Sequence, residues 1–296
     1  MGSPEFAVPS LRALAREYAV VGVVTQPDRP AGRGRGIKPP AVRLEAEHLD
    51  LPLIQPEKLT TSAAVQQIQA WAPELIVVAA FGQILRRELL ELPAYGCVNV
   101  HASLLPRWRG AAPIQAAIAA GDDETGVTIM RMDAGMDTGG ILSQERVPIA
   151  SQDTGGSLSA KLSHLGAELL STTLKDYLSG NLKPRPQDSS QASRAPILKK
   201  EDGLLDLLLP AKVLERRVRA FNPWPGAYII WEGTRLKIHR AHAEEGEARP
   251  ATRIVVDAQP ALATAQGILA LDEVQPAGKK PMRGRAFLLG ARGWTD

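Results

Sequence analysis

An amide and an imidazole stand two residues apart in the apolar segment 97–101 (CVNVH). Alternate residues of an extended strand point to the same face, so Asn99 and His101 would share one face and Val100 would take the other. Ligands bind at the carboxyl ends of the strands in open α/β sheets. An amide and an imidazole at such a place could polarise a carbonyl group and move a proton. The two residues could equally form a hydrogen-bonded cap at the end of a strand.

Two irregular segments would complete a site of this kind. Residues 103–110 (SLLPRWRG) form a loop that still contains two leucines and a tryptophan, and such apolar loop side chains line a ligand or pack under the sheet. Residues 133–140 (DAGMDTGG) are rich in glycine, which permits tight backbone conformations. Asp137 in this segment could orient His101 or take its proton. The alternative role for Asp137 is to stabilise a turn.

The elements that would position these residues alternate between strand-like and helix-like segments up to about residue 150, as in a doubly wound α/β sheet. Apolar runs predict strands at 19–25, 75–80, 97–101 and 127–132. A doubly wound domain normally opens with a strand, a glycine-containing turn and a helix. This sequence begins at the turn itself, Gly2-Ser3-Pro4. We therefore expect a first domain over residues 1–180 whose first strand is missing, so that neighbouring strands expose unpaired backbone groups.

The remaining chain has a different pattern. Residues 181–203 lack periodicity and are rich in proline, serine and glutamine, so they are expected to be a linker. Residues 204–296 contain short strand-like pieces broken by glycine and proline, which predict a small β-barrel or β-sandwich domain.

Bulk composition excludes several classes of protein. The 296 residues suffice for two domains, with 44% hydrophobic and 23% charged residues. Cys97 is the single cysteine, so a disulfide within the chain and a multi-cysteine zinc site are excluded, which fits a reducing, cytoplasmic setting. We expect no signal peptide, no membrane span and no metal, because the one histidine pair with ligand spacing, His239 and His242, lacks an obvious third ligand.

The positively charged residues are concentrated in three clusters, although the net charge is only +3. A flexible basic segment suits contact with phosphate groups, whereas a solvated surface is the alternative for any one cluster. The glycines at 32, 34 and 36 do not have the spacing of a dinucleotide fingerprint. The clusters are Arg29, Arg33, Arg35 and Lys38; Arg216, Arg217 and Arg219 on the expected outward face of a helix; and Lys279, Lys280, Arg283 and Arg285.

Together these motifs resemble the folate-dependent formyltransferases. The match consists of the Asn-x-His of 99–101, the SLLP of 103–106, the RGxAP of 109–113 and the Asp-Thr-Gly of 137–139. The resemblance implies a Rossmann-like formyltransferase domain, catalytic roles for Asn99, His101 and Asp137, and 10-formyltetrahydrofolate as co-substrate. It also implies a folate site made from the SLLP segment and the loop after residues 75–80. The residues of that site would be Ser103, Leu104, Leu105, Pro106, Phe81, Ile84 and Leu85.

Further segments are similar to family members that formylate methionine carried on initiator tRNA. They are the opening turn at 2–9, the basic segment 26–35, and residues 219–227 and 275–282 of an OB-like C-terminal domain. The resemblance implies initiator methionyl-tRNA as the partner and a role in translation initiation, and we expect a monomer. The tRNA would be contacted by Arg29, Arg33, Arg35, Lys38, Arg216, Arg217, Lys279 and Lys280. One departure is LDL at 205–207, where the family usually has IDW.

Three other functions are compatible with parts of the sequence. A formyltransferase acting on glycinamide ribonucleotide would end near the first domain, and one acting on a nucleotide-linked amino sugar would have a similar two-domain plan. The basic segment that contains Arg29 and Lys38 favours tRNA over the sugar. A non-catalytic RNA-binding protein would leave Asn99, His101 and Asp137 unexplained.

Overall fold

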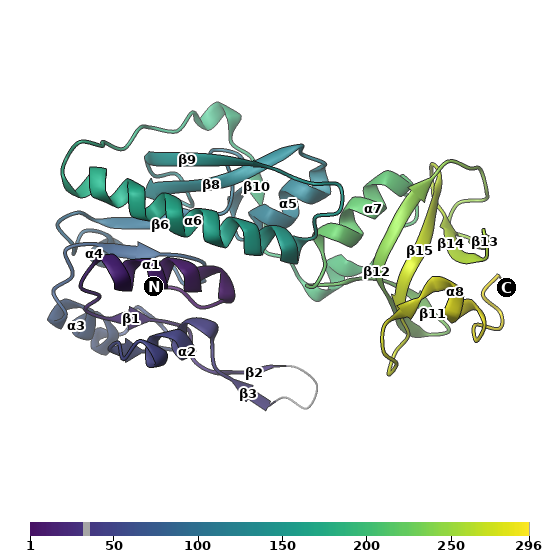
Figure 1. Cartoon of the computed structure of the whole chain (residues 1–296), viewed down its shortest axis with the longest axis horizontal. Coiled ribbons are helices and arrows are strands. Elements are labelled where there is room, and N and C mark those ends of the chain that lie inside the picture. The colour runs from purple at the N-terminus through teal and green to yellow at the C-terminus, as the bar shows by residue number, and fades with distance from the viewer. Residues whose placement is uncertain (32–35, 296) are drawn as a thin grey trace. The chain divides into compact units, whose positions relative to one another are not determined.

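The computed structural model describes residues 1–31 and 36–295 and divides into two compact units. Unit 1 comprises Met1–Pro113, Thr125–Pro148 and Ser159–Ala195. Unit 2 comprises Ile114–Glu124, Ile149–Leu158 and the residues from Pro196 onward. The predicted α/β class, with a Rossmann-like domain followed by a smaller β-rich domain, is confirmed (Figure 1).

Unit 1 is built around a four-stranded sheet, of which the first two strands are parallel and the second and third antiparallel. In spatial order the strands are β5 (Ile76–Val78), β6 (Cys97–His101), β8 (Glu124–Arg131) and β9 (Ile141–Pro148). A separate two-stranded sheet pairs β1 (Val23–Val24) in parallel with β4 (Leu53–Ile54). The helices associated with this unit are α1 (Val8–Glu17), α2 (Ala41–His48), α3 (Ser62–Ala70), α4 (Arg87–Leu90) and most of α6 (Gly155–Leu178).

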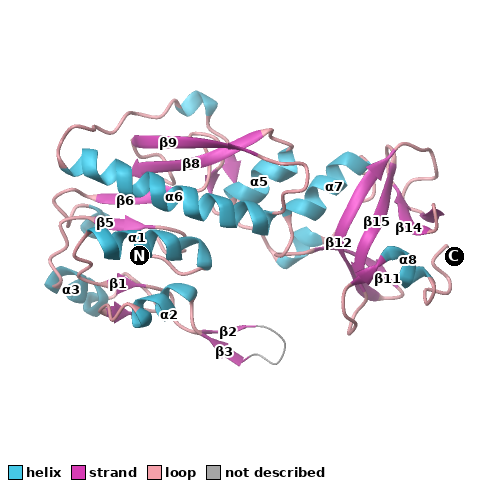
Figure 2. Ribbon diagram, viewed as in Figure 1, coloured by secondary structure: helices cyan, strands magenta, loops and turns pink. Residues whose placement is uncertain are grey.

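Helix α6 lies along the sheet, and a glycine lets it approach closely (Figure 2). A Cβ atom at Gly166 would lie 2.8 Å from Cγ1 of Val100 and 3.4 Å from Cγ1 of Val127. Both valines are fully buried on adjacent strands. A larger residue at position 166 would therefore push the helix away from the strand that carries His101.

The strands predicted at 19–25 and 75–80 are shorter in the structure, because each has a regular ladder on one side only. The runs pair as strands only at Val23–Val24 and Ile76–Val78. Between them lie the first residues of the chain: Gly2 donates to Val24 O at 3.1 Å and forms a parallel bridge with Ala79.

The aperiodic segment after α6 is attached to unit 1 as far as Ala195. Arg185 and Ile141 exchange two backbone hydrogen bonds of 2.8 Å. Further along, β10 (Arg194–Ala195) pairs in parallel with β7 (Arg109–Gly110). This short ladder brings the segment to the loop that follows His101.

Unit 2 consists mainly of an antiparallel sheet with helices packed on it. The strands in spatial order are β11 (Ala227–Trp231), β12 (Thr234–Glu244), β15 (Ile268–Gln275), β14 (Gln259–Ala263) and β13 (Arg253–Val256), with β16 (Met282–Arg283) beside β15. The helices of this unit are α5 (Pro113–Ala120), α7 (Ala211–Ala220) and α8 (Gly284–Leu288). The core joins Leu214 of α7 to Leu269 of β15, and Trp231, Phe287 and Trp294 form an aromatic cluster with ring centroids 5.0–6.2 Å apart.

No helix in residues 1–31 and 36–295 is long and apolar enough to cross a bilayer.

His239 and His242 bind different partners on the sheet of unit 2. His239 Nε2 lies 3.0 Å from Gln275 Oε1, whereas His242 lies between Asp272, at 3.0 Å, and Glu244, at 2.7 Å.

We predict that His242 titrates above its ordinary pKa of 6.5. Burial opposes the charged form, but hydrogen bonds to Asp272 and Glu244 outweigh burial and raise the pKa of His242. Its contribution to folding stability is therefore fully present below pH 6.5 and is lost as the pH rises through the higher folded-state pKa. NMR titration should show this raised pKa, and Asp272→Asn should lower it. An unchanged pKa in Asp272→Asn would contradict the assignment, and Asp257→Asn, in a turn of the same unit, is the control.

Candidate active site

Strand β6 places an amide and an imidazole at the edge of the sheet where the site was predicted. His101, the last residue of β6, is buried and pairs in the ladder with Thr128 of β8. Asn99 pairs with Met130 two positions earlier and is only half-buried. No described residue forms a hydrogen bond with the Asn99 side chain, and its amide is not enclosed. This amide is therefore available to a ligand.

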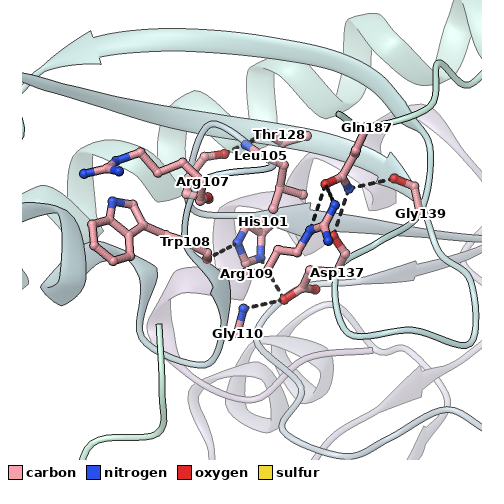
Figure 3. A network of polar contacts seen from close by, with 11 residues as sticks. His101, Leu105, Arg107, Trp108, Arg109, Gly110, Thr128, Asp137, Gly139 and Gln187 are labelled. Atoms are coloured by element: carbon pink, nitrogen blue, oxygen red, sulfur yellow. Dashed lines mark hydrogen bonds and ion pairs between the residues drawn. The ribbon is translucent and has the colours of Figure 1, made fainter. Parts of the chain in front are cut away.

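The surroundings of His101 fix its neutral form. Its Nε2 atom lies 3.0 Å from Trp108 O, which only accepts, so Nε2 carries the proton (Figure 3). Its Nδ1 atom faces Oδ2 of Asp137 at 3.7 Å, which is an ion-pair distance and too long for a hydrogen bond. Burial lowers the pKa of His101, while Asp137 and the Trp108 carbonyl act in the opposite direction. The neutral ring thus leaves Nδ1 free to accept a proton beside a carboxylate.

Asp137 is held by the loop that follows β6. Its Oδ2 atom accepts a hydrogen bond of 2.8 Å from the Gly110 N–H, and its side chain is 17% exposed. Gly110 has a φ of +122°, and a Cβ atom there would lie 2.4 Å from Ala195 O. Asp137 itself has a φ of +52°, an uncommon conformation for a residue other than glycine. Such backbone conformations persist where the surrounding contacts hold them.

Gln187 and Arg109 connect the loop that contains Asp137 to the loop that follows β6 (Figure 3). The Gln187 amide donates from Nε2 to Asp137 O and to Gly139 O, both at 2.8 Å. Its Oε1 atom accepts from Nε and Nη2 of Arg109, at 3.0 and 2.7 Å. A Cβ atom at Gly139 would lie 1.9 Å from Arg131 O, so this loop also needs glycine to lie against the strand. Gln187 therefore positions the backbone that presents the carboxylate.

The backbone of the SLLP segment is held by hydrogen bonds to polar side chains of β8 and β9. Thr128 Oγ1 donates to Ser103 O at 2.6 Å and accepts from Leu105 N at 3.1 Å. Gln144 Nε2 donates to Leu105 O at 2.9 Å. The Ser103 hydroxyl donates to Arg107 O at 2.6 Å, so it closes the turn of the loop.

The seven predicted folate residues differ in how far a ligand can reach them. Ile84 is 84% exposed, and Leu104 and Pro106 are partly exposed. The other four are buried in the protein interior, where they support the loops: Phe81, Leu85, Ser103 and Leu105.

The predicted basic segment forms a two-stranded ribbon that projects from unit 1, β2 (Arg29–Ala31) with β3 (Gly36–Lys38) (Figure 2). Arg33 and Arg35 lie outside the described residues. Arg29 and Lys38 are direct cross-strand partners. Like charges opposite each other destabilise a ladder, and an isolated two-stranded ribbon is only marginally stable. Arg29 forms a salt bridge of 2.7 Å with Glu57, which offsets its repulsion from Lys38. Both side chains of this salt bridge are exposed.

The predicted basic residues of unit 2 are placed in two ways. Lys279 and Lys280 are exposed in the turn between β15 and β16. Arg216, Arg217 and Arg219 were expected to point outward from α7, but each is partly buried, because the helix is covered on more than one side. Arg219 is bonded to Glu215 and to Asp153 O, and the guanidinium of Arg216 packs against Gly121.

Comparison with known proteins gives the family. A family model described as formyl transferase matches residues 2–174, and one described as formyl transferase, C-terminal domain, matches residues 197–292. The methionyl-tRNA formyltransferase of Myxococcus xanthus is 50% identical over 293 residues, which cover 98% of this chain and 93% of that protein. The chain belongs to the formyl transferase family, among the methionyl-tRNA formyltransferases.

Other formyl transferases are similar to this chain in sequence or in fold. The methionyl-tRNA formyltransferase of Stenotrophomonas maltophilia strain R551-3 is 49% identical, covering 98% of this chain and 96% of that protein. The fold is shared with the solved N-formyltransferase of Helicobacter canadensis, in complex with folinic acid and dTDP-3-aminofucose, at a TM-score of 0.67 and 18% identity. That match covers 91% of this chain and 97% of the other.

The sequence did not indicate one residue of this candidate site, Gln187, which falls in the segment expected to be a linker. Arg109 and Gly110 were noticed only as part of a motif, and the backbone N–H of Gly110 carries no signal in its residue type. The cluster of proline, serine and glutamine around residue 187 signals irregular backbone, but not what its side chains bind.

We predict that the pKa of His101 lies below 6.5 and falls further in Asp137→Asn, because the carboxylate is the largest effect that raises it. NMR titration of the imidazole would measure both values. Folding stability from this group is fully present above pH 6.5 and is lost as the pH falls toward the lower folded-state pKa. Asp133→Asn is the matched control, since Asp133 lies in the same loop but its carboxylate accepts hydrogen bonds from Gly135 N and Thr138 Oγ1 and is not paired with His101. A pKa that rises in Asp137→Asn would refute this geometry.

We predict that Gln187→Ala lowers kcat for formyl transfer about ten- to hundredfold, because small displacements of a reacting group have effects of this size. The His101 pKa should shift in the same variant, as Asp137 moves away from Nδ1. Gln191→Ala is the control, because the Gln191 side chain donates to the exposed Asp188. Equal activity of the two variants would show that Gln187 has no positioning role.

Proposed function

We propose that this chain transfers the formyl group of 10-formyltetrahydrofolate to the amino group of methionyl-tRNA(fMet) for translation initiation. The observation that carries the proposal is the convergence of three groups at one edge of the sheet. They are the Asn99 amide, which has no partner in the part of the chain that the structure describes, the neutral imidazole of His101 and the carboxylate of Asp137. These groups match the needs of acyl transfer to an amine: a donor for an oxyanion and an acceptor for a proton.

The reaction would be a direct attack of the amine on the formyl carbon, and the three residues would assist it. The amide N–H of Asn99 would stabilise the oxyanion that develops on the formyl oxygen. His101 Nδ1 would accept the proton released by the amine, and Asp137 would stabilise the imidazolium that results. The new C–N bond to the amine then replaces the C–N10 bond to the folate, and the proton returns to N10, so that formyl-amine and tetrahydrofolate leave.

A covalent intermediate on the enzyme is not needed. Cys97 is buried, its Sγ lies 3.4 Å from Leu89 O, and burial raises the pKa of its thiol to about 12. A thiol with this pKa is not ionised near neutral pH and is a poor nucleophile.

We predict that Asn99→Ala lowers the rate of formyl transfer by 10²–10³, which corresponds to about 2.7–4 kcal/mol, as for other oxyanion donors. Thermal stability should change little, because the Asn99 side chain has no partner among the described residues. Single-turnover transfer of labelled formyl groups to methionyl-tRNA would measure the rate. Asn181→Ala, at an exposed position, is the control, and near-normal transfer by Asn99→Ala would remove this residue from the mechanism.

Segments outside the catalytic groups would bind the tRNA. We assign catalysis to residues 1–180 and tRNA binding to the β2–β3 ribbon and to residues 204–296, joined through 181–203, in a monomeric, cytoplasmic enzyme. The ribbon supports this assignment because it places two cationic residues, Arg29 and Lys38, at directly opposite positions of its ladder, where a phosphate could pair with both. The other residues proposed to contact the tRNA are Arg33 and Arg35 between the strands of the ribbon and, in the C-terminal part of the chain, Arg216, Arg217, Lys279 and Lys280.

We predict that Lys38→Ala raises the KM for methionyl-tRNA and reduces the slope of log K against log salt by about 0.7–0.9, the value for one phosphate contact. The KM for the folate should not change. Lys175→Ala is the matched control, because Lys175 is a surface lysine of α6 paired with Glu17 at 3.4 Å. An unchanged salt slope would identify the ribbon as a solvated surface, and transfer to a nucleotide-linked amino sugar instead would identify the alternative substrate.

A further inference from the structure

The loop that follows β6 carries an arginine that lies on a tryptophan. The Cζ atom of Arg107 is over the indole of Trp108, 4.4 Å from the centre of the ring. Arg107 is exposed and Trp108 is partly exposed, so the pair reaches solvent. Figure 3 shows both side chains on one side of His101 and Asp137 on the other side. Neither side chain has a role in the attack of the amine or in the transfer of its proton.

The backbone of Trp108 is strained, and contacts hold both of its polar groups. Its φ of +63° is a left-handed conformation, which is unfavourable for a residue with a bulky side chain. Its N–H donates to Ser193 Oγ at 2.9 Å, and its C=O lies 3.0 Å from Nε2 of His101. Strained conformations of this kind concentrate at active sites and ligand clamps. The contacts therefore fix the direction in which the indole leaves the backbone beside the imidazole.

The chemistry of this pair suits an unpaired nucleobase. Such bases stack on aromatic rings and on guanidinium planes, and an arginine over an indole combines the two. A phosphate would need the charge but not the indole, and an apolar ligand would need the indole but not the charge. The residues assigned to tRNA binding so far lie in the β2–β3 ribbon and in residues 204–296. The acceptor end of the tRNA still needs a binding site of its own beside His101.

The substrate brings such a base close to His101. In methionyl-tRNA the amino acid is esterified to the ribose of the terminal nucleotide, whose base is unpaired. About seven single bonds separate the methionyl nitrogen from that base, which is a reach of roughly 8–9 Å. The carbonyl of Trp108 contacts the same imidazole ring that would accept the amine proton. One aminoacyl nucleoside can therefore reach both the imidazole and the arginine–tryptophan pair.

We propose that Arg107 and Trp108 form a stacking platform for the terminal base of the tRNA. The inference rests on the proposed function, because it takes methionyl-tRNA as the substrate. The base lies on the exposed guanidinium of Arg107, which in turn lies against the indole of Trp108. Stacking fixes the terminal nucleotide, so that the methionyl amine is held near Asn99 and near Nδ1 of His101. The two residues of the platform position the substrate and take no part in the chemical step.

The test measures the affinity of the full chain for two RNA hairpins that mimic the acceptor stem. Both hairpins carry methionine through a stable amide at the 3′ end, and one has the terminal adenine whereas the other lacks this base. We expect the wild type to bind the hairpin with the base at least about fivefold more tightly, since stacking of one base has an effect of this size or larger. Arg107→Lys, which keeps the charge but loses the plane, and Trp108→Leu should each remove most of this preference. Their affinity for the hairpin without the base should change little.

Controls separate stacking from other roles of the pair. Arg16→Lys, at an exposed position of α1, should keep the preference for the base. The His101 pKa should stay unchanged in Trp108→Leu, which would show that the Trp108 carbonyl is still in place.

Three results would overturn the proposal. They are equal weakening of both hairpins by Arg107→Lys, which indicates a phosphate contact; a preference for the base that both variants keep or that the wild type lacks; and a raised KM for 10-formyltetrahydrofolate in place of the lost preference, which indicates a folate contact. Formylation of methionyl-tRNA by the wild type, measured beside the binding assay, tests the proposed function separately.

Discussion

The geometry of the candidate active site depends on one hydrogen bond, from the Gly110 N–H to the carboxylate of Asp137, at 2.8 Å. It ties the loop after β6 to the loop after β8, and it fixes Oδ2 at 3.7 Å from Nδ1 of His101. Both ends rely on unusual backbone: Gly110 is forced by Ala195 O, and Asp137 has a positive φ. Gln187 then holds the Asp137 backbone from the other side. The chemistry therefore rests on backbone positions that only a packed structure can maintain.

Burial and charge act against each other at this site in a useful way. A buried imidazole is neutral, because desolvation disfavours its charged form. The nearby carboxylate reduces the cost of protonation without removing it, so the ring can accept a proton and release it again. The Trp108 carbonyl selects the tautomer, which leaves Nδ1 as the basic atom. The Asn99 side chain has no hydrogen-bond partner among the described residues, and so its amide can pair with a ligand.

Strands β1 and β5 of unit 1 are connected through backbone and side-chain hydrogen bonds. Gly2 donates to Val24 O, and Ala79 donates to Met1 O. The loop that begins at Phe81 follows β5 directly, and the Phe81 carbonyl accepts a hydrogen bond from the Gln26 side chain, just beyond β1. This bond joins the segments that follow the two strands.

The sequence alone determined the fold class, the strand that carries Asn99 and His101, and the loop that carries Asp137, because apolar runs and glycine-rich turns act locally. Its motifs also sufficed to identify the family. Only the tertiary structure decided that Gln187 joins the site, that Asp137 is bonded to a backbone N–H, and that Arg216 and Arg219 are partly buried. Those contacts link residues 27 to 78 positions apart in the chain, as in Asp137 with Gly110 and Arg109 with Gln187. Periodicity reports which face of an element is apolar, but it carries no information about which distant backbone group will lie within hydrogen-bond distance of a side chain.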